Sequence, residues 1–329
     1  MSRTDPPIDF AQWAACAGQP QRLSLGLGAS GSRNCIITVA TGYPADLLKP
    51  LVLSLRKYTD AHLIIVANES NDLEQAFAEY DVSIYPVKKT VGYRPYPALA
   101  RIQYYLEILA SLPANVDRLL LVDSRDIVFQ ADPFKDLPQV ELSFFSENDS
   151  TASWTLGTTN GRWAWAMLPG LMRQRLIGKP IVNGGVIAGT PAGIERMCRA
   201  KLDIALKTSE WTKHTTGLDN ISTNVIAHDS LAGECIVMPN HEVVANIYRD
   251  ASIHMDSDGK IRCGNSKPSP IVHMYDRQRE LLARVNQMYD VKQDPGLSLN
   301  QDRSVGKASR LSGLLHWLKL GRIYLTGKP

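Results

Sequence analysis

An acidic segment in the middle of the chain holds the residues with the clearest chemical potential. Four apolar residues, 119–122, run directly into Asp123, and a second carboxylate, Asp126, follows three positions later. Further apolar residues at 127–129 complete a pattern that predicts a strand, an acidic loop and a second strand. Mg²⁺ and Mn²⁺ are usually held by one or two carboxylates together with phosphate oxygens of a substrate. We therefore expect a metal site in this loop; the alternative is that the two carboxylates only end a strand and cap a turn.

The acidic loop resembles the DxD motif of the GT-A glycosyltransferases, whose acids hold a divalent cation against the diphosphate of a nucleotide sugar. The spacing differs, because Arg125 stands where a strict motif has its second acid, and Asp126 follows one position later. The resemblance implies that Asp126 binds the same metal as Asp123, or that Arg125 neutralises part of the diphosphate charge.

Two later segments resemble glycosyltransferase family 8 and related GT-A enzymes. In Asn183-Gly184-Gly185, a polar residue and paired glycines interrupt an apolar strand, which permits a close approach of the backbone to a ligand. The resemblance implies that Asn183 faces the donor sugar, with both glycines beside it. In the segment 216–224, which is predicted to open a helix, it implies that Asp219 faces the reacting sugar or the acceptor.

The apolar residues 270–272 predict a further strand, which ends at His273. In family 8 the corresponding histidine is the third protein ligand of the metal, and imidazole is compatible with Mn²⁺ although carboxylates are its commoner partners. A single histidine after a strand is usually structural. Here it follows the other motifs in the order that the family has, and the resemblance extends over residues 34–280.

The first third of the chain contains the residues expected to bind the nucleotide. The apolar runs 35–40 and 62–67 predict parallel strands joined by a helix, and ligands of such sheets bind at the carboxyl ends of the strands. Thr41 and Tyr43 follow the first strand and Asn68 follows the second. GT-A enzymes hold the base and ribose at these places; ordinary turns between strand and helix are the alternative.

A predicted amphipathic helix over residues 98–112 carries Arg101 near its start. The family 8 resemblance implies that this residue touches the sugar diphosphate, and the planar fork of arginine suits phosphate oxygens. The alternative is a solvated arginine on a helix surface.

The alternation of strands and helices predicts an α/β fold with a Rossmann-like, mixed and mostly parallel sheet, which the resemblance narrows to GT-A. We expect three parts: a lead-in at 1–33, a catalytic domain at 34–290 and a basic tail at 291–329. The tail contains an amphipathic helical pattern at 308–325, and from Arg303 onwards it has six basic residues and no acid. This pattern predicts either peripheral contact with a membrane or packing against the catalytic domain.

Composition limits the remaining classes of function. Without the basic residues of the tail, 30 basic residues face 33 acidic ones, so the sequence does not indicate nucleic-acid binding. The five cysteines form no CxxC pair, which argues against a disulfide framework and a zinc site. With neither a signal peptide nor a long apolar segment, we expect a cytoplasmic protein, and if the tail contacts a membrane, it does so at the inner face.

Three tryptophans, Trp154, Trp163 and Trp165, lie in a segment without clear periodicity. Exposed aromatic rings commonly bind the faces of sugars, whereas tryptophans are more often partly buried core residues. Both interpretations stay open.

The expected function is the transfer of a sugar from a nucleotide diphosphate sugar to a carbohydrate or lipid-linked acceptor, as in cell-surface polysaccharide synthesis. The resemblance implies a hexosyltransferase that requires Mn²⁺ or Mg²⁺ and retains the anomeric configuration. One alternative is a sugar nucleotidyltransferase, although such an enzyme would carry a glycine-rich triphosphate loop after its first strand. The other is a non-catalytic, membrane-associated protein that binds nucleotide sugars, which Arg125 in place of an acid favours.

Overall fold

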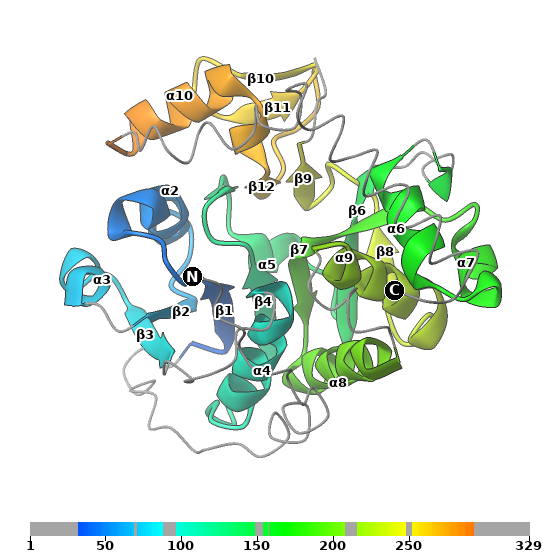
Figure 1. Cartoon of the computed structure of the whole chain (residues 1–329). Coiled ribbons are helices and arrows are strands. Elements are labelled where there is room, and N and C mark those ends of the chain that lie inside the picture. Colours follow the sequence, from blue (N-terminus) through cyan, green and yellow to red (C-terminus); the bar gives the residue numbers. More distant parts are fainter. Residues whose placement is uncertain are drawn as a thin grey trace, which may run out of the picture.

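The computed structural model describes residues 32–68, 71–87, 97–148, 154–156, 158–207, 216–247 and 252–292. At its centre lies a seven-stranded sheet with the order β3-β2-β1-β4-β7-β6-β8 (Figure 1). Its strands are β1 (Asn34–Val39), β2 (His62–Asn68), β3 (Val82–Val87), β4 (Arg118–Val122), β6 (Leu142–Asn148), β7 (Ile181–Gly189) and β8 (Ile236–Met238). The pairs that include β7 are antiparallel and the other four pairs are parallel.

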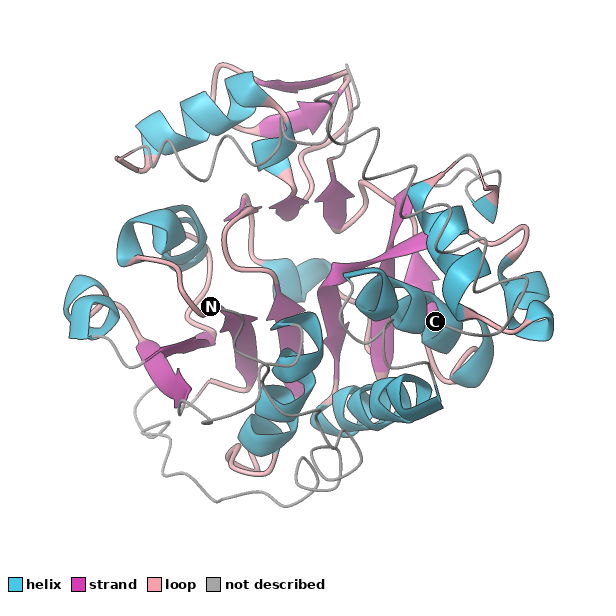
Figure 2. Cartoon of the chain, viewed as in Figure 1, coloured by secondary structure: helices cyan, strands magenta, loops and turns pink. Residues whose placement is uncertain are grey.

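Helices cover both faces of this sheet (Figure 2). They are α2 (Ala45–Arg56), α3 (Asn71–Ala76), α4 (Pro97–Leu109), α5 (Pro133–Asp136), α6 (Thr159–Met167), α7 (Gly170–Leu176), α8 (Pro191–Lys207) and α9 (Thr216–Val225), which continues into the π-helix η3 (Ile226–Ser230). Successive residues of a strand point to opposite faces, so Ile37 of β1 packs in one core with α4, α8 and α9. Its neighbour Ile36 packs in the other core, with α2 and α3.

A second, smaller sheet lies above the carboxyl edge of the first one (upper part of Figure 1). It has the order β5-β12-β9, with β5 at Ile127–Phe129, β12 at Ile271–His273 and β9 at Val244–Asn246. Strands β10 (Ile253–Met255) and β11 (Ile261–Cys263) form a two-stranded sheet beside it, followed by η4 (Tyr275–Arg277) and α10 (Arg279–Met288). Because β12 pairs with β5, the end of the acidic loop lies beside a segment that is far away in the sequence.

The predicted α/β fold with a mixed, mostly parallel sheet is confirmed. The segment of the three tryptophans is more ordered than its pattern indicates, because it forms α6 and α7. Almost all of the lead-in at 1–33 and of the tail at 291–329, with its helical pattern at 308–325, lies outside the described residues. Among the described helices, none combines the length and the apolar character needed to cross a bilayer.

Candidate functional site

The predicted nucleotide-binding residues lie along one edge of the main sheet. Strand β1 lies between β2 and β4 and is parallel to both, so the three strands end at the same edge. Thr41 and Tyr43 follow β1, Asn68 is the last residue of β2, and Asp123 comes directly after β4. This edge is where open α/β sheets bind their ligands.

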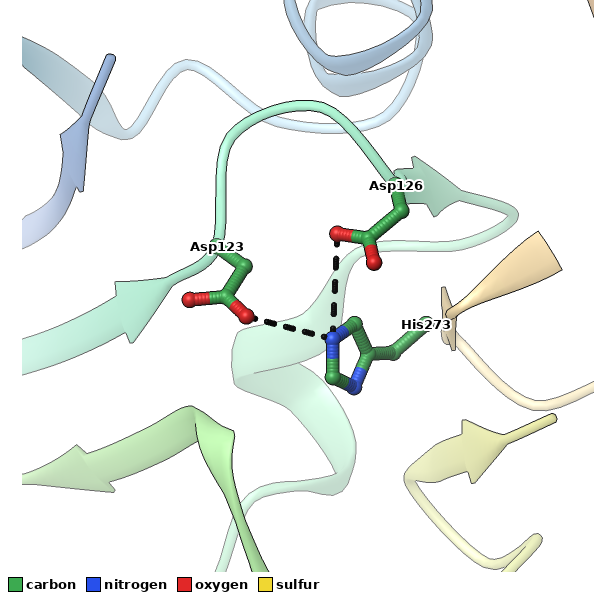
Figure 3. A group of neighbouring side chains, drawn as sticks. All are labelled: Asp123, Asp126 and His273. Atoms are coloured by element: carbon green, nitrogen blue, oxygen red, sulfur yellow. Dashed lines mark ion pairs between the residues drawn. The ribbon is translucent and has the colours of Figure 1, made fainter. Parts of the chain in front are cut away.

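Asp123, Asp126 and His273 form a compact group whose ligand-capable atoms all lie within 4.8 Å of one another (Figure 3). The Nε2 atom of His273 is 3.4 Å from Oδ2 of Asp123 and 3.8 Å from Oδ1 of Asp126. Backbone hydrogen bonds hold both ends of the acidic loop. The amide of Asp123 donates to the carbonyl of Gly185 (2.7 Å), and the amide of Met274 donates to the carbonyl of Asp126 (2.9 Å).

Asn246 determines how the imidazole of His273 presents itself to the two carboxylates. The side-chain nitrogen of Asn246 donates to the carbonyl of Ser146 (2.9 Å), so its Oδ1 is the atom that faces Nδ1 of His273, at 2.8 Å. Nδ1 therefore carries the hydrogen, and a neutral ring turns the lone pair of Nε2 toward Asp123 and Asp126. Nε2 is buried and has no hydrogen-bond partner among the described residues.

Such a lone pair facing two carboxylates is unfavourable unless a positive charge lies between them. Protonation of the ring is one source of this charge. Burial lowers the pKa of His273, but the nearby carboxylates, Asp126 first, outweigh burial and raise the pKa. A divalent cation would supply the same positive charge. One imidazole nitrogen and two carboxylates, with the second ring nitrogen fixed by an amide, are a suitable ligand set for Mn²⁺ or Mg²⁺.

The two carboxylates experience different surroundings. Burial would raise the pKa of Asp123, but the neighbouring His273 and the guanidinium of Arg101 hold it well below its usual range. For Asp126 burial prevails and raises the pKa, although His273 opposes it. Asp123 is thus the permanently ionised member of the group.

Gly185 leaves the room that this group needs. A Cβ atom at this position would lie 2.3 Å from Cε1 and 2.6 Å from Nε2 of His273, and 2.7 Å from Oδ2 of Asp123. The amide of Gly185 donates to Oδ1 of Asn183 (2.7 Å), while the side-chain nitrogen of Asn183 points toward Glu147 (3.4 Å). Asn183 therefore shapes the backbone beside Asp123 and His273.

Arg101 lies between Asp219 and the candidate metal-binding group of Asp123, Asp126 and His273. Its guanidinium donates to Oδ1 of Asp123 (2.9 Å) and to the carbonyl of Gly184 (3.3 Å), and it forms an ion pair with Asp219. Only 15% of its side chain is exposed, so the interpretation of Arg101 as a solvated surface residue is wrong. All three of its partners, Asp123, Gly184 and Asp219, are predicted site residues.

Asp219 has a second cationic partner, Lys201, which the sequence did not reveal as part of the site. The Nζ atom of Lys201 is 2.8 Å from Oδ1 of Asp219, and only 3% of the lysine side chain is exposed. A signal was present: Lys201 continues the buried stripe of α8 that contains Ile194, Met197 and Cys198, where an apolar residue is expected. A lysine in such a stripe is buried only if it is paired.

We expect Lys201→Met to lower the free energy of unfolding by about 3 kcal/mol, because it leaves a buried carboxylate with Arg101 as its remaining cation. Chemical denaturation monitored by circular dichroism measures this effect. Lys207→Met is the matched control, since Lys207 lies on the same helix and pairs with Asp203 at 3.9 Å, but its side chain is 79% exposed. The control should change stability by less than about 0.5 kcal/mol. Equal effects of both substitutions would contradict the assigned role of the buried pair.

Arg125, which departs from a strict DxD motif, forms an ion pair with Asp276, a residue outside the candidate metal-binding group. Its guanidinium is 2.5 Å from Oδ2 of Asp276, and its carbonyl accepts a hydrogen bond from the hydroxyl of Tyr275 (3.0 Å). Met274 lies between His273 and the two residues that contact Arg125, and its φ of 65° lies in the left-handed region. Such a conformation is uncommon for a residue other than glycine and lets the chain turn immediately after His273.

The structure thus joins Asp123, Asp126 and His273 directly, and links them to Arg101, Asp219 and the Asn183-Gly184-Gly185 segment. Arg125 pairs with Asp276, while Thr41, Tyr43 and Asn68 lie at the neighbouring strand ends. No model of a known protein family matches this chain, and none of the curated proteins matches it.

Proposed function

We propose that this chain is a metal-dependent glycosyltransferase of the GT-A type, which transfers a sugar from a nucleoside diphosphate sugar to a carbohydrate or lipid-linked acceptor. One observation carries the proposal: Nε2 of His273, which has no hydrogen-bond partner in the part of the chain that the structure describes, faces Asp123 and Asp126 at the carboxyl edge of the sheet. A cation held there would meet a diphosphate at the place where such sheets bind nucleotides.

When bound, the metal would stabilise the negative charge that develops on the leaving diphosphate. The charge of Arg125 is compensated by Asp276, so the arginine does not compete with a cation at the acidic loop. This pairing supports the metal site despite the departure from the motif.

Asp219 is the charged residue that would face the donor sugar. Its two carboxylate oxygens are engaged by Arg101 and Lys201, which hold it between two cations. This double pairing favours a positioning and electrostatic role for Asp219 over attack on the sugar as a nucleophile. The oxygen of Asn183 is bound to the backbone of Gly185, and its amide nitrogen, 3.4 Å from Oε2 of Glu147, would exchange that contact for a hydroxyl of the sugar.

A thermal-shift panel of UDP, GDP, CMP and their sugar conjugates, each with Mn²⁺ and with EDTA, tests the proposal. We expect stabilisation by one nucleotide family, and only with Mn²⁺. A ligand at a hundred times its dissociation constant should add about 2.7 kcal/mol. No shift with any compound, in folded protein, would overturn the proposal, and a shift that survives EDTA would overturn its metal dependence.

The conjugate that binds best is then incubated with Mn²⁺ in the absence of an acceptor. Slow release of the free sugar would separate a transferase from a non-catalytic protein that only binds the nucleotide sugar. Formation of the conjugate from a nucleoside triphosphate and a sugar phosphate would instead identify a nucleotidyltransferase.

A further inference from the structure

Helices α6 and α7, with the residues that join and follow them, form a helix pair at residues 158–179 that exposes apolar side chains. Leu171 is 75% exposed and Ile177 is 65% exposed, and Trp165 of α6 is exposed as well. Together with the nearby Leu156, these are four of the seven large apolar side chains that the described residues expose. Apolar exposure is therefore concentrated on this part of the molecule, which lies at the side of the sheet in Figure 1.

The same segment is basic. Between residues 150 and 194 the sequence contains no aspartate or glutamate, while the helix pair has Arg162, Arg173, Arg175 and Lys179. The guanidinium of Arg173 lies 4.3 Å from the centre of the Trp165 ring and donates to the Trp165 carbonyl (3.0 Å). Arg175 pairs with Asp229 of η3 at the edge of the helix pair, yet 62% of its side chain stays exposed.

We propose that the helix pair docks on the surface of an anionic lipid bilayer. Protruding leucine, isoleucine and tryptophan side chains beside arginine and lysine are typical of segments that lie in the membrane interface. A bilayer accepts such protruding side chains without a complementary groove. The helix pair is attached to the rest of the fold, because the indole nitrogen of Trp154 donates to the carbonyl of Lys179 (2.9 Å) and the side chain of Leu176 is buried in the core.

Charge argues against the C-terminal tail as the cover of this surface. From Arg303 onwards the tail has six basic residues and no acid, so it carries the same sign of charge as the helix pair. Like charges disfavour packing of one on the other, whereas an anionic surface attracts both. An anionic partner outside the chain is therefore favoured.

The helix pair also connects to the candidate site. The side-chain nitrogen of Asn220 in α9 donates to Oδ1 of Asn160 in α6 (2.8 Å), and Gly217 leaves the space that the ring of Trp163 fills. Asp219 belongs to the same turn of α9. The lipid contact is independent of sugar transfer, but under the proposed function it would bring a lipid-linked acceptor near α9, the helix that carries Asp219.

Co-sedimentation of the full chain with vesicles tests this proposal. The vesicles consist of phosphatidylcholine alone or of phosphatidylcholine mixed with phosphatidylglycerol. We expect the chain to bind the mixed vesicles, and the double variant Leu171→Ser, Ile177→Ser to bind them at least about tenfold more weakly, since each residue would lose apolar burial. Lys179→Glu should also weaken binding, and added salt should do so for the unaltered chain.

The matched control is the double variant Leu206→Ser, Met288→Ser, which removes two exposed apolar side chains from α8 and α10. It should bind as the unaltered chain does. Thermal unfolding of each variant verifies that it is folded. Unchanged binding by the Leu171, Ile177 variant would assign lipid contact to another segment and overturn the proposal, as would failure of the unaltered chain to bind mixed vesicles.

Discussion

Asp123→Asn is expected to abolish tight Mn²⁺ binding and to slow sugar transfer by about a thousandfold, the loss of several kcal/mol of charge stabilisation in the transition state. Asparagine keeps the shape of the side chain and its acceptor for Arg101, so the variant should fold. It removes the charge of the group member whose pKa is held lowest, and with it the strongest attraction for a cation. Mn²⁺ binding is measured by electron paramagnetic resonance, independently of any activity.

The matched control is Asp117→Asn, because Asp117 lies just before β4 and Asp123 lies just after it. Asp117 pairs with Arg33 at the opposite end of the strand, where both side chains are well exposed. This control should bind Mn²⁺ and transfer sugar as the unaltered chain does. Normal turnover by Asp123→Asn would contradict the proposal that the acidic loop holds a metal.

Gly185→Ala is expected to weaken Mn²⁺ binding by about 10–100-fold, although alanine provides and removes no ligand. The added Cβ would overlap the ring of His273 at 2.3 Å, far closer than two unbonded carbon atoms can approach. The ring cannot simply swing away, because Nδ1 is bound to Asn246. The strain should also lower the free energy of unfolding by about 1–3 kcal/mol, measured by chemical denaturation.

Gly233→Ala serves as its control, since a Cβ atom there meets no atom of the described residues within 4 Å. We expect this variant to match the unaltered chain in stability and in Mn²⁺ affinity. Equal Mn²⁺ binding by Gly185→Ala would contradict the inference that the site needs the space that glycine leaves beside His273.

Much of the framework of this protein was evident in its sequence. The apolar runs that form β1, β2 and β4 are buried on both faces, so they appear as continuous stretches of the chain. The acidic loop was recognisable because two carboxylates directly after such a run have no role in packing. Not every short element was recognisable: the three-residue strand β9 carries too little periodicity to be distinguished from a loop, whereas the strand before His273 was predicted and is β12.

The site depended on contacts that no local pattern encodes. Arg101 and Asp219 are separated by 118 positions, and Arg125 and Asp276 by 151. The sequence alone left Arg101 open between a surface position and a ligand-binding one, because an arginine on an amphipathic helix satisfies both patterns. Burial beside two carboxylates excludes the surface position, and contact with a diphosphate stays a prediction.

The sequence by itself determined the α/β alternation, the order of the motifs and the chemical types of the residues that could hold a metal. Only the tertiary structure decided that His273 turns Nε2 toward Asp123 and Asp126, that Lys201 is buried against Asp219, and that Arg125 is neutralised by Asp276. The physical reason is that periodicity reports which side of an element is buried. The partner of a buried charge is set by how separate elements pack, and that packing joins residues from distant parts of the chain.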